Sequence, residues 1–470
     1  MENERVVTNS EVNRYALYGF FQNIAIMVPF IYGQFFMTDI LDIGIAKVTT
    51  ALLVGRIFDF IVSVLAGGII ESSHLKWGKY RSWFVIGRWT LFFGIIFQLT
   101  NAMTLPTNAQ LVICAIGYMM MHGTMNFVAT ANMGVLSLIA GPDMEGRFRM
   151  TVATSRYGAV AGIITGAAIL PVIGLFERFL SPANAYMAVA VLFGCLVLIG
   201  AQIIIRLSEP YDKREMWDAA EGTPRERVRV SDMFAAVAGN DQLLIYMGAT
   251  TLTNIGMAIF GAFTMYFYRL ILGNLNFYTI ASTATTIFGL VAAMVMPRLG
   301  ARLGKRRSLP VSQMWVAVGY IINAVVLSTV WRTPMTALIS YIVIACAVMC
   351  GTYLAMGYGA NYVIDCGEYG FWKTGKDYRA VVMSMMNIPM KIGMVIGGAI
   401  GGYILANIGY SGAMSPGDVT AAFARTFLYS WFGYPAACNI IASLMLTFAY
   451  KLTDDNTAKY AAENAARIRA

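Results

Sequence analysis

Long runs of apolar residues alternate with short polar connections along the whole chain. Twelve of these runs are long enough to cross a bilayer as a helix, which takes about 20 residues. They cover residues 15–38, 45–70, 82–103, 109–139, 153–175, 185–206, 240–268, 277–297, 308–330, 335–362, 382–406 and 426–450. The pattern predicts an all-α polytopic membrane protein with twelve transmembrane helices.

Basic residues gather in every second connection, after the even-numbered runs, as in Lys76–Arg81 and Arg302–Arg307. Lys and Arg accumulate in the cytoplasmic loops of membrane proteins, so both termini are predicted to be cytoplasmic. The same rule accounts for the net charge of +9 without a nucleic-acid partner.

The composition argues against a soluble enzyme. The chain is 58% hydrophobic and 13% charged, whereas soluble domains are about 25% charged. Motifs for a nucleophilic serine, a phosphate-binding loop or a zinc protease are missing. We therefore expect no catalytic residues, no metal and no cofactor. The polar, acidic N-terminus lacks the basic region of a signal peptide, so the first apolar helix is expected to remain.

A polar connection at 207–239 divides the apolar runs six and six. We expect a cytoplasmic N-terminus at 1–14, six-helix halves at 15–206 and 240–450, and a cytoplasmic tail at 451–470. Three short matches relate the halves at similar offsets: Trp77–Arg81 with Leu303–Arg307, Ala131-Asn132 with Ala360-Asn361, and Arg156 with Lys391. They favour a pseudo-symmetric pair around a central substrate site.

Two charged residues, Arg56 and Asp59, interrupt the second apolar run. A charge near the bilayer centre costs about 2.5 to 3.5 kcal/mol. Three residues apart on a helix, the two side chains share one face. They should therefore pair with each other or face a polar cavity.

Three blocks of sequence resemble the glycoside, pentoside and hexuronide:cation symporters, the melibiose-permease-like branch of the major facilitator superfamily. The family pattern ARIWDAINDP followed by WGKFKPW corresponds to residues 55–60 and 77–83. The exit of the fourth span, 132–138, leads to Glu145–Arg147. The pattern DTVDYGEWKTGKR corresponds to residues 363–376. The resemblance implies a secondary sugar transporter with two six-helix halves.

The chain departs from this family at the cation site. Cation-coupled members carry two acidic residues in the second span with an Asn between them. Here Asp59 is retained, but Val62 and Ser63 replace the Asn and the second acid, and Ala129 replaces a Thr that helps to bind sodium. A sodium ion prefers several oxygen ligands, whereas one buried carboxylate can carry a proton. Proton coupling through Asp59, with Arg56 and Ser63 beside it, is favoured over sodium coupling. A fixed Arg56–Asp59 ion pair and sodium held by other ligands stay open.

The substrate positions change as well. Where melibiose-like members grip sugar hydroxyls with acids, this chain has Asn23, preceded by Gln22, and Asn132, while Leu136 replaces a stacking aromatic residue. Amides both donate and accept hydrogen bonds and do not repel an anion as carboxylates do.

The basic residues that border the family's substrate cavity match Arg156 and Lys391. Compared with melibiose-like members, this chain lacks two acidic residues at the substrate cavity and keeps two basic ones. We therefore expect an anionic substrate such as a hexuronide or a sulfosugar. Tyr353 and Asn387 are further candidates for sugar contact. The alternatives are that Arg156 and Lys391 pair locally and that the other two residues only pack between helices.

Charged residues near the cytoplasmic ends are candidates for gating: Arg147, Asp365, Glu368, Lys373 and Arg379. Ion pairs across the two halves would hold one access state and break in the other. Solvated loop charges are the alternative.

Taken together, the sequence predicts a transporter of the inner membrane that moves a sugar derivative by alternating access, coupled to H+ or possibly Na+. Its expected partners are the sugar and the lipid bilayer, and we expect a monomer. An uncoupled uniporter and a lipid-handling or sensor relative on the same fold are the alternatives.

Overall fold

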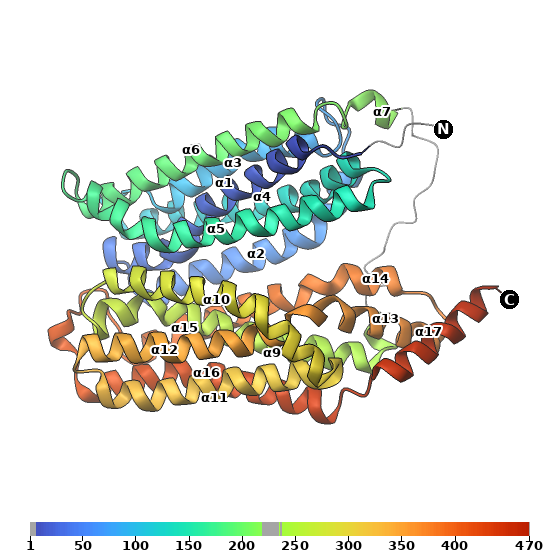
Figure 1. Ribbon diagram of the computed structural model, residues 1–470. Coiled ribbons are helices and arrows are strands. Elements are labelled where there is room, and N and C mark those ends of the chain that lie inside the picture. The colour runs from blue at the N-terminus through green and yellow to red at the C-terminus, as the bar shows by residue number, and fades with distance from the viewer. Residues whose placement is uncertain (1–5, 219–234, 236, 470) are drawn as a thin grey trace. The chain divides into compact units, whose positions relative to one another are not determined.

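The computed structural model describes residues 6–218, 235 and 237–469, and within these residues the regular structure is helical (Figure 1). Each of the twelve predicted runs coincides with one or more helices, which confirms the all-α prediction. Eleven helices in the described residues are long and apolar enough to cross a membrane.

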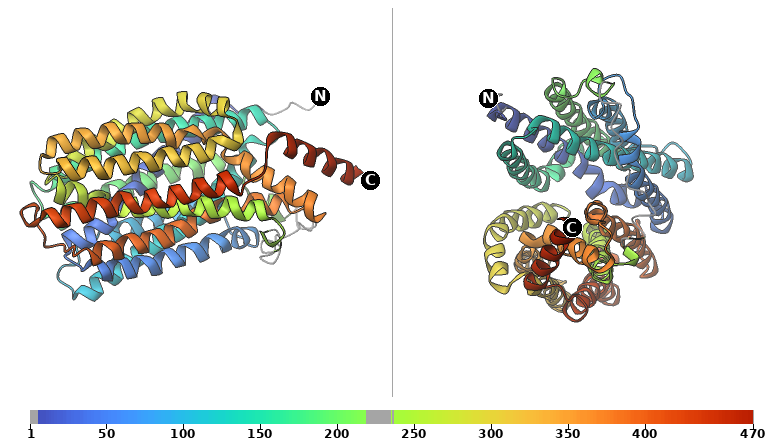
Figure 2. Two further views of the ribbon diagram at one scale, coloured as in Figure 1. Left: turned by 90° about the horizontal axis from the view of Figure 1, so that it is seen from below. Right: turned by 90° about the vertical axis from the view of Figure 1, so that its right-hand side faces the viewer.

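The chain divides into two compact units, the first mainly residues 1–224 and the second mainly residues 225–470. Much of the predicted linker 207–239 lies outside the described residues. In each unit the long helices pack side by side as a bundle (Figure 2).

The first unit contains six long helices and one short one. They are α1 (Asn9–Phe35), extended by a π-helical turn (Phe36–Ile40), α2 (Ile45–Glu71), α3 (Arg81–Gln98), α4 (Thr107–Ala140), α5 (Met144–Phe176), α6 (Pro182–Ser208) and α7 (Arg214–Asp218).

The second unit contains two interrupted helices. Its elements are α9 (Asp241–Tyr266) with a π-helical turn (Phe267–Ile271), α10 (Asn276–Leu303), α11 (Lys305–Val330), α12 (Pro334–Leu354), α13 (Gly359–Thr374), α14 (Arg379–Ser384), α15 (Ile388–Asn407), α16 (Ala421–Phe448) and α17 (Asp454–Arg469). Short 3-10 turns, Met356–Tyr358, Met385–Asn387 and Pro416–Asp418, connect α12 to α13, connect α14 to α15 and precede α16.

The third predicted span differs from its neighbours in polarity and length. Its residues form α3, but α3 is not among the eleven helices that qualify as membrane spans. It has 18 residues and carries both Arg81 and Arg88. At 1.5 Å per residue the helix is roughly 27 Å long, so polarity and short length together set it apart from its neighbours.

Two predicted spans are broken rather than continuous. The run 335–362 ends as α12 at Leu354, and after a 3-10 turn α13 begins at Gly359 and continues to Thr374. The run 382–406 begins in α14 and resumes as α15, with Pro389 in its first turn. Proline lacks a backbone N–H and suits the start of a helix, which explains the second break.

Side chains and glycines fix the helix ends and contacts. Thr8 and Glu11 form a capping box at the start of α1, and Asn240 accepts the Leu243 N–H at the start of α9. Such caps satisfy donors that a helix leaves unpaired. In α15, a Cβ atom on Gly397 would lie 2.4 Å from the Ile255 carbonyl oxygen of α9. Glycine therefore lets these two helices approach closely.

Beyond the last long helix, α17 extends from the bundle toward the C-terminus (Figure 2). It packs against α13, where the Trp372 ring lies 4.4 Å from that of Tyr460. The Trp372 indole donates a hydrogen bond of 2.7 Å to Glu463, and the buried Asn464 amide donates one of 2.8 Å to Glu368. Residues that the sequence indicated only as a tail thus form a docked helix.

Candidate functional site

Asp59 lies in α2 with 7% of its surface exposed, and α4 supplies a hydrogen-bond donor to it. The Asn126 amide donates to Asp59 Oδ1 at 2.7 Å and also to the His122 carbonyl oxygen at 3.0 Å. Asn126 and His122 are four residues apart, so they lie on one face of α4. A charge-assisted bond of this kind is roughly twice as strong as a neutral one and orients the carboxylate toward α4.

Aromatic residues of α1 and α4 pack around His122, one turn before Asn126. The Tyr118 and His122 rings stack with centroids 4.0 Å apart, and Phe30 of α1 lies 6.3 Å from His122. Arg56 and Asp59 both act electrostatically on the Tyr118 hydroxyl group, so the three side chains share one locality. Ser63, one turn along α2, donates to the Phe60 carbonyl oxygen at 2.7 Å. We call Arg56, Asp59, Tyr118, His122 and Asn126 the α2–α4 polar cluster.

The predicted substrate amides of the first unit have different local partners. Gln22 Nε2 of α1 lies 3.3 Å from the sulfur of Met125 in α4. Asn23 donates to the Gly19 carbonyl oxygen of its own helix at 2.8 Å. The Asn132 side-chain oxygen is buried and accepts no hydrogen bond within the described residues. A buried acceptor of this kind calls for a water or ligand donor.

Arg156 lies in α5, twelve residues after its first residue, and its side chain is exposed. No salt bridge among the described residues involves it. Apolar helical sequence follows it, so Arg156 places a guanidinium along a membrane helix with no carboxylate partner in the part of the chain that the structure describes.

In the second unit, the three remaining substrate candidates lie near the two helix breaks. Tyr353 packs against a small buried cluster of Ala292, Met296 and Leu354 near the end of α12. Asn387 is exposed at the junction of α14 and α15, and Lys391 lies half-buried in the first turn of α15. The breaks thus place polar side chains where the chain leaves regular helix.

The predicted gating residues of α13 have ion-pair partners inside the second unit. Asp365, 5% exposed, lies 2.5 Å from Lys305 Nζ, which also lies 2.6 Å from the Asp454 carboxylate. Burial raises the pKa of Asp365, although the Lys305 ammonium opposes this shift. Together Lys305, Asp365 and Asp454 connect the starts of α11 and α17 to α13, and we call them the Lys305 cluster.

Three further ion pairs lie in the second half of α13 and just after it. Arg379 bonds to Glu368 at 3.0 Å and to Asp377 at 2.6 Å. Lys373 Nζ lies 2.5 Å from the Asp241 carboxylate at the start of α9, and this hydrogen bond raises the pKa of Lys373.

Arg147, the remaining gating candidate, is exposed near the start of α5. Its neighbour Asp143 caps α5, accepting the Gly146 N–H at 2.7 Å and the Val7 N–H at 2.8 Å. These hydrogen bonds hold the pKa of Asp143 below its usual range. They also tie the segment before α1 to the connection between α4 and α5.

Sequence reasoning missed Asn126 and Lys305 as partners. Asn126 is one amide in a long apolar helix, and without its α2 neighbour nothing distinguishes it from a packing residue. In the sequence, Lys305 is one of several basic residues in a connection between predicted spans. Within the described residues, no group of three or more His, Cys, Asp or Glu side chains could hold a metal ion.

Comparison with known proteins gives consistent matches across nearly the whole chain. The family model described as MFS/sugar transport protein matches residues 15–454. An isoprimeverose transporter of Lactiplantibacillus pentosus is 24% identical over 87% of this chain and 82% of its own length. A putative sulfoquinovose importer of Salmonella typhimurium is 22% identical over 94% of this chain and 90% of its own.

The chain covers only part of some relatives. It spans 64% of the raffinose carrier protein of Pediococcus pentosaceus, to which it is 24% identical over 89% of its own length. Among solved structures, the nucleoside transporter NupG superposes with a TM-score of 0.64 at 15% identity, covering 93% of this chain and 99% of NupG. At that identity the likeness concerns the fold.

Proposed function

Because the chain belongs to the MFS/sugar transport protein family, we propose that it carries an anionic sugar derivative, such as a hexuronide or a sulfosugar, coupled to protons. The predicted resemblance to the glycoside, pentoside and hexuronide:cation symporters is confirmed, and the protein is a multi-pass membrane transporter rather than an enzyme. The charge of the substrate and the coupling ion are our proposals.

Arg156 carries the proposal of an anionic substrate. An arginine facing lipid costs about 2.5 to 3.5 kcal/mol at the bilayer centre, and no carboxylate among the described residues offsets that cost for Arg156. Its side chain should therefore face a hydrated space. A guanidinium there suits a carboxylate or a sulfonate, because two of its N–H groups can donate side by side to two oxygens of the anion.

The amides support a sugar as the rest of the ligand. The unsatisfied Asn132 oxygen can accept a sugar hydroxyl, and Gln22 and Asn23 offer donors and acceptors from α1. One relative is named as a putative sulfoquinovose importer, and sulfoquinovose is a sugar bearing a sulfonate. In the second unit, Lys391, Tyr353 and Asn387 stay candidates for sugar contact.

Uptake into proteoliposomes tests this proposal. A glucuronide and its neutral glucoside analogue would be compared with wild type, Arg156→Gln and the control Arg178→Gln, whose exposed arginine lies just beyond the end of α5. Loss of a charge-assisted contact should lower glucuronide transport roughly tenfold in Arg156→Gln only. Equal transport of the two glycosides by wild type would refute the anionic preference.

Asp59 carries the proposal of proton coupling. It is a single buried carboxylate with a neutral amide donor, Asn126, and a proton needs one carboxylate whereas a hard cation needs several oxygens. An imposed pH gradient should drive uptake in wild type, and Asp59→Asn should abolish this acceleration while substrate exchange continues. Acceleration by a sodium gradient would contradict the proposal, and insensitivity to both gradients would indicate a uniporter.

A further inference from the structure

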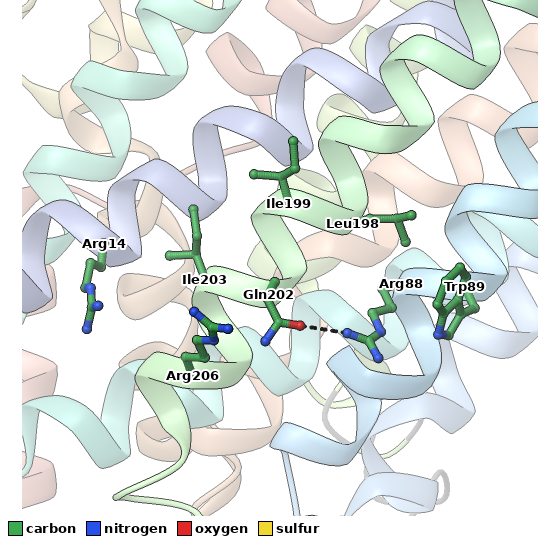
Figure 3. Close-up of a pocket in the computed structure, with 8 residues that line it drawn as sticks. All are labelled: Arg14, Arg88, Trp89, Leu198, Ile199, Gln202, Ile203 and Arg206. Carbon is green, nitrogen blue, oxygen red and sulfur yellow. Dashed lines mark hydrogen bonds between the residues drawn. The ribbon is translucent and has the colours of Figure 1, made fainter.

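A groove with a volume of about 530 Å³ opens on the first unit where α1, α3 and α6 meet. Figure 3 shows its lining, with Gln202 and the other α6 side chains between Arg14 of α1 and Arg88 of α3. The lining residues are Arg14, Arg88, Trp89, Leu198, Ile199, Gln202, Ile203 and Arg206. None of them belongs to the α2–α4 polar cluster or to the substrate candidates.

Three arginines line this groove, and no acidic side chain is among the described residues around it. Arg88 donates to Gln202 Oε1 at 2.9 Å, a neutral acceptor, while its buried Nε has no acceptor among the described residues. Arg14 and Arg206 likewise form no salt bridge within the described part of the chain. Cations that line one groove repel one another, so an anion between Arg88 and Arg206, which lie on either side of Gln202 in Figure 3, would stabilise the groove.

The rest of the groove is apolar and faces outward. Trp89 is 47% exposed and Ile199 is 49% exposed, and Leu198 and Ile203 continue the same surface along α6. Exposed apolar side chains on a membrane-spanning helix are covered by acyl chains. Cations and hydrocarbon-binding surface therefore lie side by side in one groove.

The position along the helices matches the depth of a lipid headgroup. Arg14 lies five residues after the start of α1, Arg88 seven residues after the start of α3, and Arg206 two residues before the end of α6. At 1.5 Å per residue, each lies within roughly 11 Å of its helix end. Tryptophan and arginine are both favoured at the boundary between headgroups and acyl chains.

We propose that this groove binds one anionic phospholipid, with its phosphate between Arg88 and Arg206 and an acyl chain against Trp89, Leu198 and Ile199. Basic pockets between membrane helices suit such headgroups. Arginine pairs with phosphate through two parallel hydrogen bonds. The apolar lining favours a lipid over a free phosphate ion, which would leave that surface unused. The proposal is independent of the sugar and of the coupling ion.

Native mass spectrometry of the purified full-length protein tests the site. Phosphatidylglycerol would be titrated against wild type, Arg88→Gln, Arg206→Gln and the control Arg307→Gln, whose exposed arginine lies near the start of α11. Loss of one charge-assisted contact should weaken binding of the most tightly held lipid roughly tenfold in each groove variant. The control should bind like wild type.

Two further measurements separate a loss of lipid binding from a loss of folding, and a loss of charge from a loss of paired geometry. Thermal unfolding in phosphatidylcholine vesicles identifies any variant that fails to fold, and Arg88→Lys, which keeps the charge but loses the paired geometry, should bind with intermediate affinity. Wild-type affinity in both groove variants, or an equal loss in Arg307→Gln, would overturn the proposal. Displacement of the lipid by millimolar inorganic phosphate would also overturn it, since the site would then be one for a free anion.

Discussion

Asn126 of α4 donates a hydrogen bond of 2.7 Å to the buried Asp59 carboxylate of α2. The sequence departs from its family at Val62, where cation-coupled members carry an Asn in α2 itself. In this protein an amide from the neighbouring helix contacts the carboxylate instead. The α2–α4 contact therefore fixes the orientation of the proposed proton carrier.

Replacing Asn126 with Leu should impair both stability and coupling. The substitution leaves a buried carboxylate without this donor, which costs about 1 to 3 kcal/mol. Thermal unfolding should show the loss, and uptake driven by a pH gradient should fall more than substrate exchange. The control is Thr130→Ala, one turn along α4, whose exposed hydroxyl donates to the Asn126 carbonyl oxygen. Coupling that survives in Asn126→Leu would contradict the assigned role.

In the Lys305 cluster, the two carboxylates should respond unequally to mutation. Lys305→Met leaves the buried Asp365 without its cation, and breaking a buried pair costs about 3 to 5 kcal/mol. Asp454 is 71% exposed, so Asp454→Asn should cost no more than about 1 kcal/mol. Thermal unfolding of both variants measures the difference. If Lys305→Met lowers stability no more than Asp454→Asn does, Asp365 does not depend on Lys305.

Acidification should release the segment before α1. The pKa of Asp143 is lowered in the folded state, mainly by the Val7 N–H, so its contribution is complete above the unfolded value of about 3.9 and is lost as pH falls through the lowered folded value. The protection of the Val7 amide, measured as its exchange rate relative to the intrinsic rate at the same pH, should therefore fall below that range. In Asp143→Ala this protection should be low at every pH, and persistent protection in that variant would show that other contacts hold the segment.

Gly397→Ala should destabilise the contact between α15 and α9. The new methyl group would lie 2.4 Å from the Ile255 carbonyl oxygen and 2.9 Å from the Ala258 Cβ, and overpacking of this kind costs about 1 to 3 kcal/mol. Gly261→Ala on α9 is the matched control, because nothing lies within 4 Å of its added Cβ. It should be neutral or slightly stabilising. Equal melting temperatures for the two variants would refute close packing at Gly397.

Hydrophobic runs predicted the helices well because a bilayer requires about 20 apolar residues wherever a helix crosses it. They did not predict the interruption after Leu354, where the apolar run passes through a 3-10 turn without a change of composition. They also did not reveal α17, whose polar sequence is held by the Trp372–Tyr460 contact with α13.

The sequence indicated candidate site residues where a charge interrupts an apolar run, as Arg56, Asp59 and Arg156 do. It did not indicate their partners, since Asp59 and Asn126 lie 67 positions apart, and Lys305 and Asp365 lie 365 − 305 = 60 positions apart. A single sequence carries no record of which side chains meet over such a distance. Arg14, Arg88 and Arg206 illustrate the same limit, because three separate helices bring them into one groove.

The polarity of α3 has a consequence for biogenesis. Arg81 and Arg88 make this helix a poor substrate for independent insertion, and the Gln202 acceptor for Arg88 belongs to α6, more than a hundred residues later in the chain. During synthesis, the half-buried Arg88 of α3 has no Gln202 acceptor until α6 has been made. The first six helices should thus leave the translocon as a cooperative group, with α3 completing its insertion late.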